Sequence, residues 1–169
     1  MGYCHQRNSN ELVIVAIRIK SGKWPRTWID LAQLPANFTP NPERILDVSL
    51  NGSMDQVMEL SSRIHEFCRK YSDDEKKIHR LALCIEEMAG NIARHGRKGN
   101  KPLSIDIRVI MEEDIIFRMR DNGVPFNPIQ YDDHQSGSED TIGIHLVRGI
   151  TKEIKYTYAN SMNNLMIKL

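Results

Sequence analysis

The chain has 169 residues, of which 40% are hydrophobic and 27% are charged, and its formal net charge at pH 7 is +1. This length favours one domain with a substantial core over two domains. The near-neutral charge gives no indication of nucleic-acid binding, which usually needs a strong basic excess, and no apolar run approaches the ~20 residues of a membrane span.

Residues 1–43 are predicted to form an N-terminal extension or connector. They contain one strand candidate at 12–20 (LVIVAIRIK), followed by a stretch rich in Pro and Trp without a clear period. A hairpin, a connector and the end of a longer upstream region are all compatible with this pattern. The start of the chain has no secretory signal, and its three cysteines lack metal-binding spacing. We therefore expect a cytoplasmic protein with reduced thiols.

From residue 44 onward the hydrophobic periodicity is clear and predicts one domain over residues 44–169. The expected elements, in chain order, are a strand at 45–50, helices at 57–71 and 75–95, strands at 103–111 and 115–121, a loop at 127–141, a helix at 143–150, and strands at 152–159 and 165–169. Clustered strands with helices on one side predict an α+β two-layer sandwich, with a mixed and mostly antiparallel sheet.

Two local details complete this prediction. Ser72 is the expected N-cap of the second helix, because Glu75 follows three residues later as in a capping box. The Asn-rich stretch at 160–164 is expected to be the turn between the last two strands.

The second helix carries polar side chains beside its apolar stripe. Glu87, Asn91 and His95 follow one another at intervals of four residues, which places them along one line of a helix. Gly90 costs roughly 1 kcal/mol relative to Ala, which suggests that something approaches the helix closely there. The line is either the polar edge of a buried helix or a metal-phosphate site. In the second case Asn91 offers a hard oxygen for Mg²⁺ and Glu87 a general base.

Asp121 shares a strand face with the apolar residues of the 115–121 strand. A carboxylate on a core-facing position is costly unless it has a partner. That partner is either an arginine, such as Arg120, or the amine of a ligand in a pocket that opens at the strand end. In the second case Gly123 would let a flat ring approach the backbone closely.

Three segments in this order are more specific than any one of them: IEEMAGNIARHG (85–96), RDNGVPF (120–126) and TIGIHLVRGI (141–150). Together they resemble the nucleotide-binding motifs of the GHKL ATPase superfamily, which includes gyrase-type ATPases, Hsp90 chaperones, histidine kinases and MutL proteins. Within it they look most like the anti-sigma-factor serine kinases. The resemblance covers about residues 45–169. It implies that superfamily's Bergerat-type ATP-binding fold, a two-layer α/β sandwich.

The resemblance also implies roles for individual residues. Asn91 would bind the Mg²⁺ that bridges the phosphates of ATP, and Glu87 would be the general base. Asp121 would accept a hydrogen bond from the adenine amine. Residues 127–142 would form a lid. The nucleotide-binding positions that it implies are Asn91, His95, Gly96, Asp121, Gly123, Phe126, Thr141, Ile142, Gly143 and Ile144.

Two positions of the third motif bear on how the phosphates would be bound. Gly143 would begin a helix whose free N–H groups meet the phosphates. Thr141 stands where the family has glycine, and a β-branched residue there resists a positive φ, so the lid would close differently or bind ATP less tightly. Arg148, one turn further, is expected to face the surface.

Four functions remain open at this point. The first is a serine kinase that phosphorylates a STAS-type anti-anti-sigma protein or sequesters a sigma factor, and a homodimer is common in that branch. The second is a nucleotide-sensing module without transfer activity. The third is a histidine kinase domain, disfavoured because His65 and its neighbours lack a phosphoacceptor box. The fourth is an α+β domain without a ligand.

Overall fold

The computed structural model describes residues 41–131 and 139–169. The strand expected at 12–20 and the central part of the expected loop, residues 132–138, lie outside the described residues. The domain boundary at residue 44 therefore stays a prediction.

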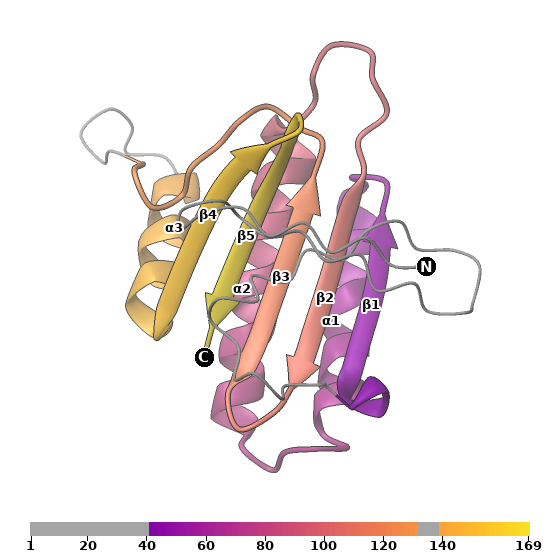
Figure 1. The fold of residues 1–169 in the computed structure, drawn as a ribbon, viewed down its shortest axis with the longest axis vertical. Helices are drawn as coiled ribbons and strands as arrows, with labels where there is room; N and C mark the ends of the chain where they lie inside the picture. Colours follow the sequence, from indigo (N-terminus) through magenta and orange to yellow (C-terminus); the bar gives the residue numbers. More distant parts are fainter. Residues whose placement is uncertain (1–40, 132–138) are drawn as a thin grey trace, which may run out of the picture. The chain divides into compact units, whose positions relative to one another are not determined.

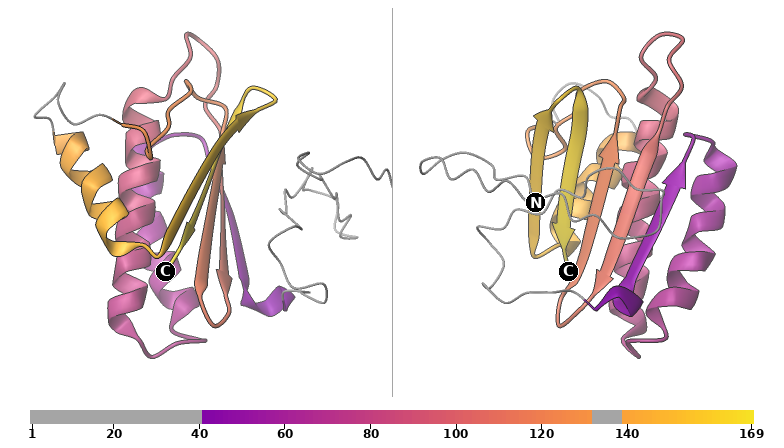
Figure 2. Two further views of the ribbon diagram at one scale, coloured as in Figure 1. Left: turned by 60° about the vertical axis from the view of Figure 1, so that its left-hand side comes forward. Right: turned by 45° about the vertical axis from the view of Figure 1, so that its right-hand side comes forward.

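The described residues form a five-stranded sheet with helices on one face, which confirms the α+β sandwich (Figures 1 and 2). The strands lie in the order β1-β2-β3-β5-β4. Their bounds are β1 Ile45–Leu50, β2 Ile105–Met111, β3 Ile115–Asp121, β4 Glu153–Ala159 and β5 Met162–Lys168. The helices are α1 Met54–Cys68, α2 Glu75–His95 and α3 Glu139–Ile150. Among these helices none is long and apolar enough to cross a membrane.

Every strand pair in the described sheet is antiparallel, whereas the sequence suggested a mixed sheet. The chain reverses direction three times between β1 and β2, before α1, between α1 and α2, and after α2, so these neighbours run in opposite directions. Strands β3 and β4 do run in the same direction, but β5 lies between them. The crossover through α3 therefore creates no parallel pair.

Several element boundaries differ from the prediction. Helix α1 spans Met54–Cys68 instead of 57–71, and β2 begins at Ile105 instead of residue 103. Asp74, and not Ser72, caps α2, because its Oδ1 accepts from the N–H of Lys77 at 3.0 Å. The helix α3 begins at residue 139 instead of 143. The last turn is shorter than expected, because Asn160 and Ser161 both adopt a positive φ (52° and 61°), which closes a tight hairpin. As a result β5 begins before residue 165.

The core lies between the inner face of the sheet and the helices. Phe117 in β3, Ile85 in α2 and Ile167 in β5 are at most 1% exposed. Burying each such side chain contributes about 1.5–3 kcal/mol relative to exposure. This packing fixes α2 against the sheet and brings the C-terminal half of α2 over the end of β3.

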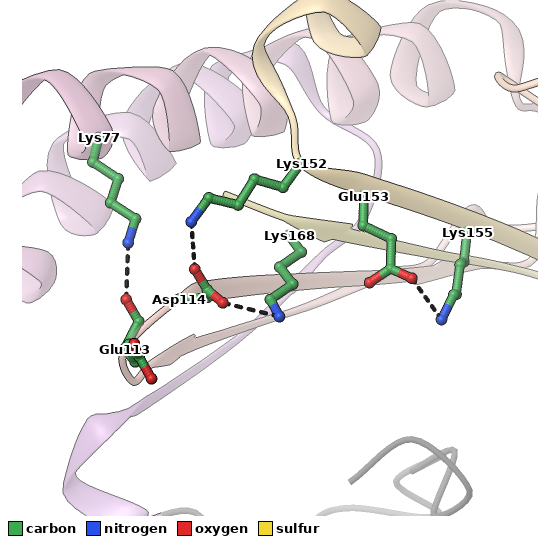
Figure 3. A network of polar contacts seen from close by, with 7 residues as sticks. All are labelled: Lys77, Glu113, Asp114, Lys152, Glu153, Lys155 and Lys168. Atoms are coloured by element: carbon green, nitrogen blue, oxygen red, sulfur yellow. Dashed lines mark hydrogen bonds and ion pairs between the residues drawn. The ribbon is translucent and has the colours of Figure 1, made fainter.

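A polar network ties the turn between β2 and β3 to neighbouring elements (Figure 3). Asp114 pairs with Lys152 before β4 at 2.5 Å and with Lys168 at the end of β5 at 2.9 Å. Lys77 of α2 donates to the backbone oxygen of Glu113 at 3.0 Å. The network lies at the end of β3 opposite Asp121, so it holds the sheet and α2 together away from the candidate site.

Candidate functional site

A cavity of about 320 Å³ opens between α2, α3, the ends of β3, β4 and β5, and the segment that follows β3. Its lining is mostly apolar, with Met88 and Ile92 of α2 facing Met119 and Leu165 of the sheet. Six residues that the sequence predicted for the site line it: Asn91, His95, Gly96, Asp121, Phe126 and Ile144. Two of the three predicted motifs thus meet at one pocket, and the third contributes one wall.

Asp121 is the acidic group of this pocket and is 3% exposed. Its Oδ1 accepts from the N–H of Gly123 at 2.9 Å and from Nδ2 of Asn163 at 2.8 Å. Burial raises the pKa of this carboxyl, and the two hydrogen bonds partly offset that rise. Within residues 41–131 and 139–169 its Oδ2 receives no hydrogen bond. Arg120 is not its partner, because strand alternation places the two residues on opposite faces.

Asn163 is a site residue that the sequence analysis missed. Its Nδ2 donates to Asp121 and to the backbone oxygen of Val124 at 3.0 Å. Its Oδ1 accepts from the hydroxyl of Tyr156 at 2.6 Å and from the N–H of Phe126 at 3.2 Å. This network orients Asp121 and the start of the following segment. Alternation backward from Leu165 would have placed Asn163 on the pocket face, opposite Asp121.

The sequence suggested that Gly123 leaves room for a flat ring. In the structure, the missing side chain instead allows close packing of the backbone. A Cβ atom built there would lie 2.6 Å from the backbone oxygen of Gly96 and 2.8 Å from Oδ1 of Asp121. The next residue, Val124, donates its N–H to the same oxygen of Gly96 at 2.9 Å. The second motif is therefore packed directly against the C-terminal end of α2.

Asn91 is 7% exposed, and its two side-chain atoms differ in their surroundings. Its Oδ1 accepts from Nη2 of Arg94 at 2.7 Å, while its buried Nδ2 has no partner in the described part of the chain. An unsatisfied buried donor costs about 1–3 kcal/mol. Such a group fits a site that awaits the oxygen of a ligand. Gly90 makes room for Arg94 itself, because a Cβ there would lie 3.1 Å from its guanidinium.

Glu87 does not line the cavity. It is half-buried, and its carboxylate lies against Gly143 of α3, where a Cβ atom would come within 2.1 Å of Oε2. Since α3 begins at Glu139, Gly143 already lies inside the helix. Only the first four N–H groups of a helix lack internal partners, so in α3 these belong to residues 139–142. The free N–H groups that the sequence placed at Gly143 therefore belong to the first turn of α3 instead.

The other residues of the first and third motifs differ in exposure. His95 ends α2 and is exposed, and Ile142 is 69% exposed, whereas Ile144 is 1% exposed. The side chain of Thr141 lies outside the described residues. Arg148, which we expected at the surface, is half-buried and donates to backbone oxygens of the segment after β3.

The family profile described as "Histidine kinase-like ATPase domain" matches residues 50–169. Among solved structures, the chain is similar to the RsbU and RsbW domains of Rv1364c from Mycobacterium tuberculosis, with 11% identity, a TM-score of 0.54, and coverage of 73% of this chain and 31% of that chain. At this identity the likeness shows the fold alone.

A second structure, the histidine kinase domain of the blue-light activated histidine kinase from Erythrobacter litoralis EL346, has 12% identity, a TM-score of 0.46, and coverage of 69% of this chain and 59% of that chain. The chain therefore spans less than two thirds of either solved structure. No protein of curated function matches the sequence.

Proposed function

The chain belongs to the family of histidine kinase-like ATPase domains, and from this membership we propose that it binds Mg²⁺-ATP in the cavity beside Asp121 and uses it to phosphorylate or control a partner protein. Membership of an ATPase family implies ATP binding. The metal, the transfer reaction and the partner are the proposed part.

The observation that carries the proposal is the buried carboxylate in a mostly apolar pocket. Asp121 has one oxygen held by Gly123 and Asn163 and a second oxygen that receives no hydrogen bond from the described residues. A flat heterocycle suits the apolar walls, and an exocyclic amine suits the second oxygen. A site built to pair with a buried polar group discriminates strongly against a ligand that lacks the matching donor.

The phosphate end is proposed to lie between α2 and the first turn of α3. Asn91 offers the side-chain oxygen that suits Mg²⁺, which is usually held by one or two protein groups together with phosphates and waters. The free N–H groups of residues 139–142 and the helix dipole favour an anion. Bound there, Mg²⁺-ATP would supply the phosphoryl group and the charge that neutralises it. Glu87 would accept the proton of the attacking hydroxyl.

The partner class rests on the resemblance of the three motifs to anti-sigma-factor serine kinases. We propose a STAS-type anti-anti-sigma protein or a sigma factor as that partner.

The alternative function is a nucleotide-sensing module without transfer, and one observation favours it. Of the three polar groups proposed for the site, Asp121, Asn91 and Glu87, two already contact the chain itself. Glu87 lies against Gly143, and the oxygen of Asn91 accepts from Arg94. The cavity proposed for adenine is open, whereas the groups proposed for catalysis, Glu87 and the oxygen of Asn91, are covered.

The first experiment is a titration of ATP into the protein with and without Mg²⁺, for the wild type, Asp121→Asn and Asn91→Ala. Asp121→Asn should weaken binding in both conditions, and Asn91→Ala should remove the Mg²⁺-dependent gain. Absence of binding by the wild type would refute the proposal.

The second experiment incubates the protein with labelled ATP and candidate STAS proteins. Transfer that Glu87→Ala leaves unchanged would remove the base assignment, and binding without transfer would favour the sensing module.

A further inference from the structure

Arg148 joins α3 to the segment that forms the outer wall of the cavity. It lies in the last turn of α3, and its side chain is half-buried. Its Nε donates to the backbone oxygen of Pro128 at 2.8 Å, and its Nη2 donates to the same oxygen and to that of Tyr131 at 3.0 Å. One guanidinium thus connects two backbone carbonyls that lie far from it in the sequence.

These carbonyls belong to a compact turn at residues 127–131. The side chain of Asn127 accepts from the N–H of Ile129 at 2.9 Å, and its backbone oxygen accepts from Gln130 at 3.3 Å. Pro128 and Tyr131 both line the cavity, and the ring of Tyr131 lies 5.5 Å from that of Phe126. The turn therefore presents an aromatic pair to the same pocket as Asp121.

The turn is not part of the sheet, so its position depends on side-chain contacts. Helix α3 is firmly anchored, because Ile144 and Val147 are at most 1% exposed. Arg148 directly follows Val147 and reaches from the anchored helix to the turn. A guanidinium can hold both carbonyls at once because its donors form a rigid planar fork, whereas the ammonium of lysine cannot reproduce that geometry.

We infer that Arg148 is a positioning residue for the base-binding half of the pocket, and this inference rests on the proposed binding of ATP. Arg148 does not line the cavity. It acts through Pro128 and Tyr131, which it holds as the wall that covers the base. Because the wall contacts the base and not the phosphates, loss of Arg148 should weaken adenosine and ATP by the same factor.

The test is calorimetric titration of adenosine and of Mg²⁺-ATP into the wild type, Arg148→Gln and Arg148→Lys, with thermal unfolding of each variant. Arg63→Gln is the matched control, because Arg63 is an exposed residue of α1, remote in sequence from the pocket segments. For Arg148→Gln we expect an affinity loss of about tenfold for both ligands, the effect of one lost charge-assisted hydrogen bond. Arg148→Lys should lie between Arg148→Gln and the wild type.

A double substitution separates positioning from general stability. Tyr131→Ala should itself weaken adenosine, and Arg148→Gln should then add less than it does in the wild type. An unchanged affinity in Arg148→Gln, or a loss for ATP without a loss for adenosine, overturns the inference while ATP binding stands. A wild type that binds neither ligand overturns both. If Arg148→Gln does not fold, Arg148→Lys decides: an adenosine affinity equal to that of the wild type overturns the inference.

Discussion

The guanidinium of Arg94 donates to the side-chain oxygen of Asn91 over 2.7 Å, and this is the oxygen proposed to bind Mg²⁺. The bond joins two residues one turn apart on α2, and Gly90 leaves space for it because a side chain there would meet the guanidinium. A cation therefore already occupies the position beside the proposed metal ligand. Two cations that share one oxygen repel each other, so Mg²⁺ bound as proposed would have to displace Arg94.

The first prediction is that Arg94→Ala lowers the Mg²⁺ concentration needed for half-maximal ATP binding. Removal of the competing guanidinium frees the oxygen of Asn91 and reduces local positive charge. A charge-assisted hydrogen bond is worth about 1.5–3 kcal/mol, which corresponds to at least about tenfold in the Mg²⁺ midpoint if the competition is complete. The measurement is a Mg²⁺ titration at fixed ATP. Arg97→Ala, which removes an exposed cation just beyond α2, should leave the midpoint unchanged.

The second prediction concerns Asp121→Asn, which should reduce ATP affinity about tenfold to hundredfold without lowering the melting temperature at pH 7. Asn keeps an oxygen for Gly123 and Asn163, but it places an amide N–H₂ where the ligand amine needs an acceptor. Burial raises the pKa of Asp121, so ionisation of this group costs stability in the folded protein. A neutral side chain removes that cost.

The sign of the pH dependence follows from the same shift. Because the folded pKa is raised, the native state binds more protons than the unfolded state once the pH exceeds the ordinary value of 3.8. The stability of the wild type relative to Asp121→Asn should therefore fall as the pH rises from 3.8 through the raised pKa. A relative stability that rises over this range would contradict the burial argument. Denaturant unfolding at several pH values measures it.

The sequence predicts features that depend on the alternation of apolar and polar side chains along a strand. It does not predict features that depend on backbone atoms far away in the chain. Strand β3 has the predicted bounds because Ile115, Phe117 and Met119 alternate without interruption, and the same alternation placed Asp121 inward. Asn163 was assigned to a turn because its neighbours are also turn-forming residues. Only the pairing of β5 with β3 shows that it faces Asp121.

Other differences between the predicted and the observed structure also depend on contacts that no local sequence pattern shows. The partners of Arg148 are main-chain carbonyls, which every residue has, so no sequence pattern could indicate them. The early start of α3 was missed because the polar residues before Thr141 have no apolar periodicity. Ser72 and Asp74 are both good caps, and the choice between them depends on where the chain turns out of α1.

The third prediction concerns the network around Asp114 (Figure 3). Hydrogen bonds from Lys152 and then Lys168 lower the pKa of Asp114 from 3.8 to about 2. Asp114→Asn should destabilise the protein at pH 7 by less than about 1 kcal/mol, because both ion pairs reach solvent, with the side chains of Lys152 and Lys168 60% and 38% exposed. Since the folded pKa is lowered, this contribution is present above pH 3.8 and lost as the pH falls through about 2.

Chemical denaturation of the wild type and Asp114→Asn at pH 7, with and without added salt, checks this prediction. Salt should reduce the difference, because exposed ion pairs are screened. ATP affinity should be unchanged, since the network lies at the end of β3 away from Asp121. A destabilisation that persists in high salt would mean that Asp114 acts by packing instead of by charge.

The fourth prediction uses the contact between Gly143 and Glu87. A Cβ atom at residue 143 would come within 2.1 Å of Oε2 of Glu87, which is the far end of a flexible side chain. Gly143→Ala should therefore displace the carboxylate at little cost in stability, because the side chain can move aside. If Glu87 is the general base, phosphoryl transfer or ATP hydrolysis should fall by about tenfold or more, the usual contribution of a positioned base being about 10²–10⁴.

Gly149→Ala is the matched control on the same helix, because a Cβ atom there meets nothing within 4 Å. It should raise the free energy of unfolding by about 1 kcal/mol, the usual difference between Gly and Ala inside a helix, with no change in rate. Both rates are measured with labelled ATP and compared with Glu87→Ala. In the Glu87→Ala background, Gly143→Ala should have no further effect on the rate, because the group that it displaces is gone. A further loss would show that Gly143 affects the reaction through α3 itself, and the contact with Glu87 would then be structural.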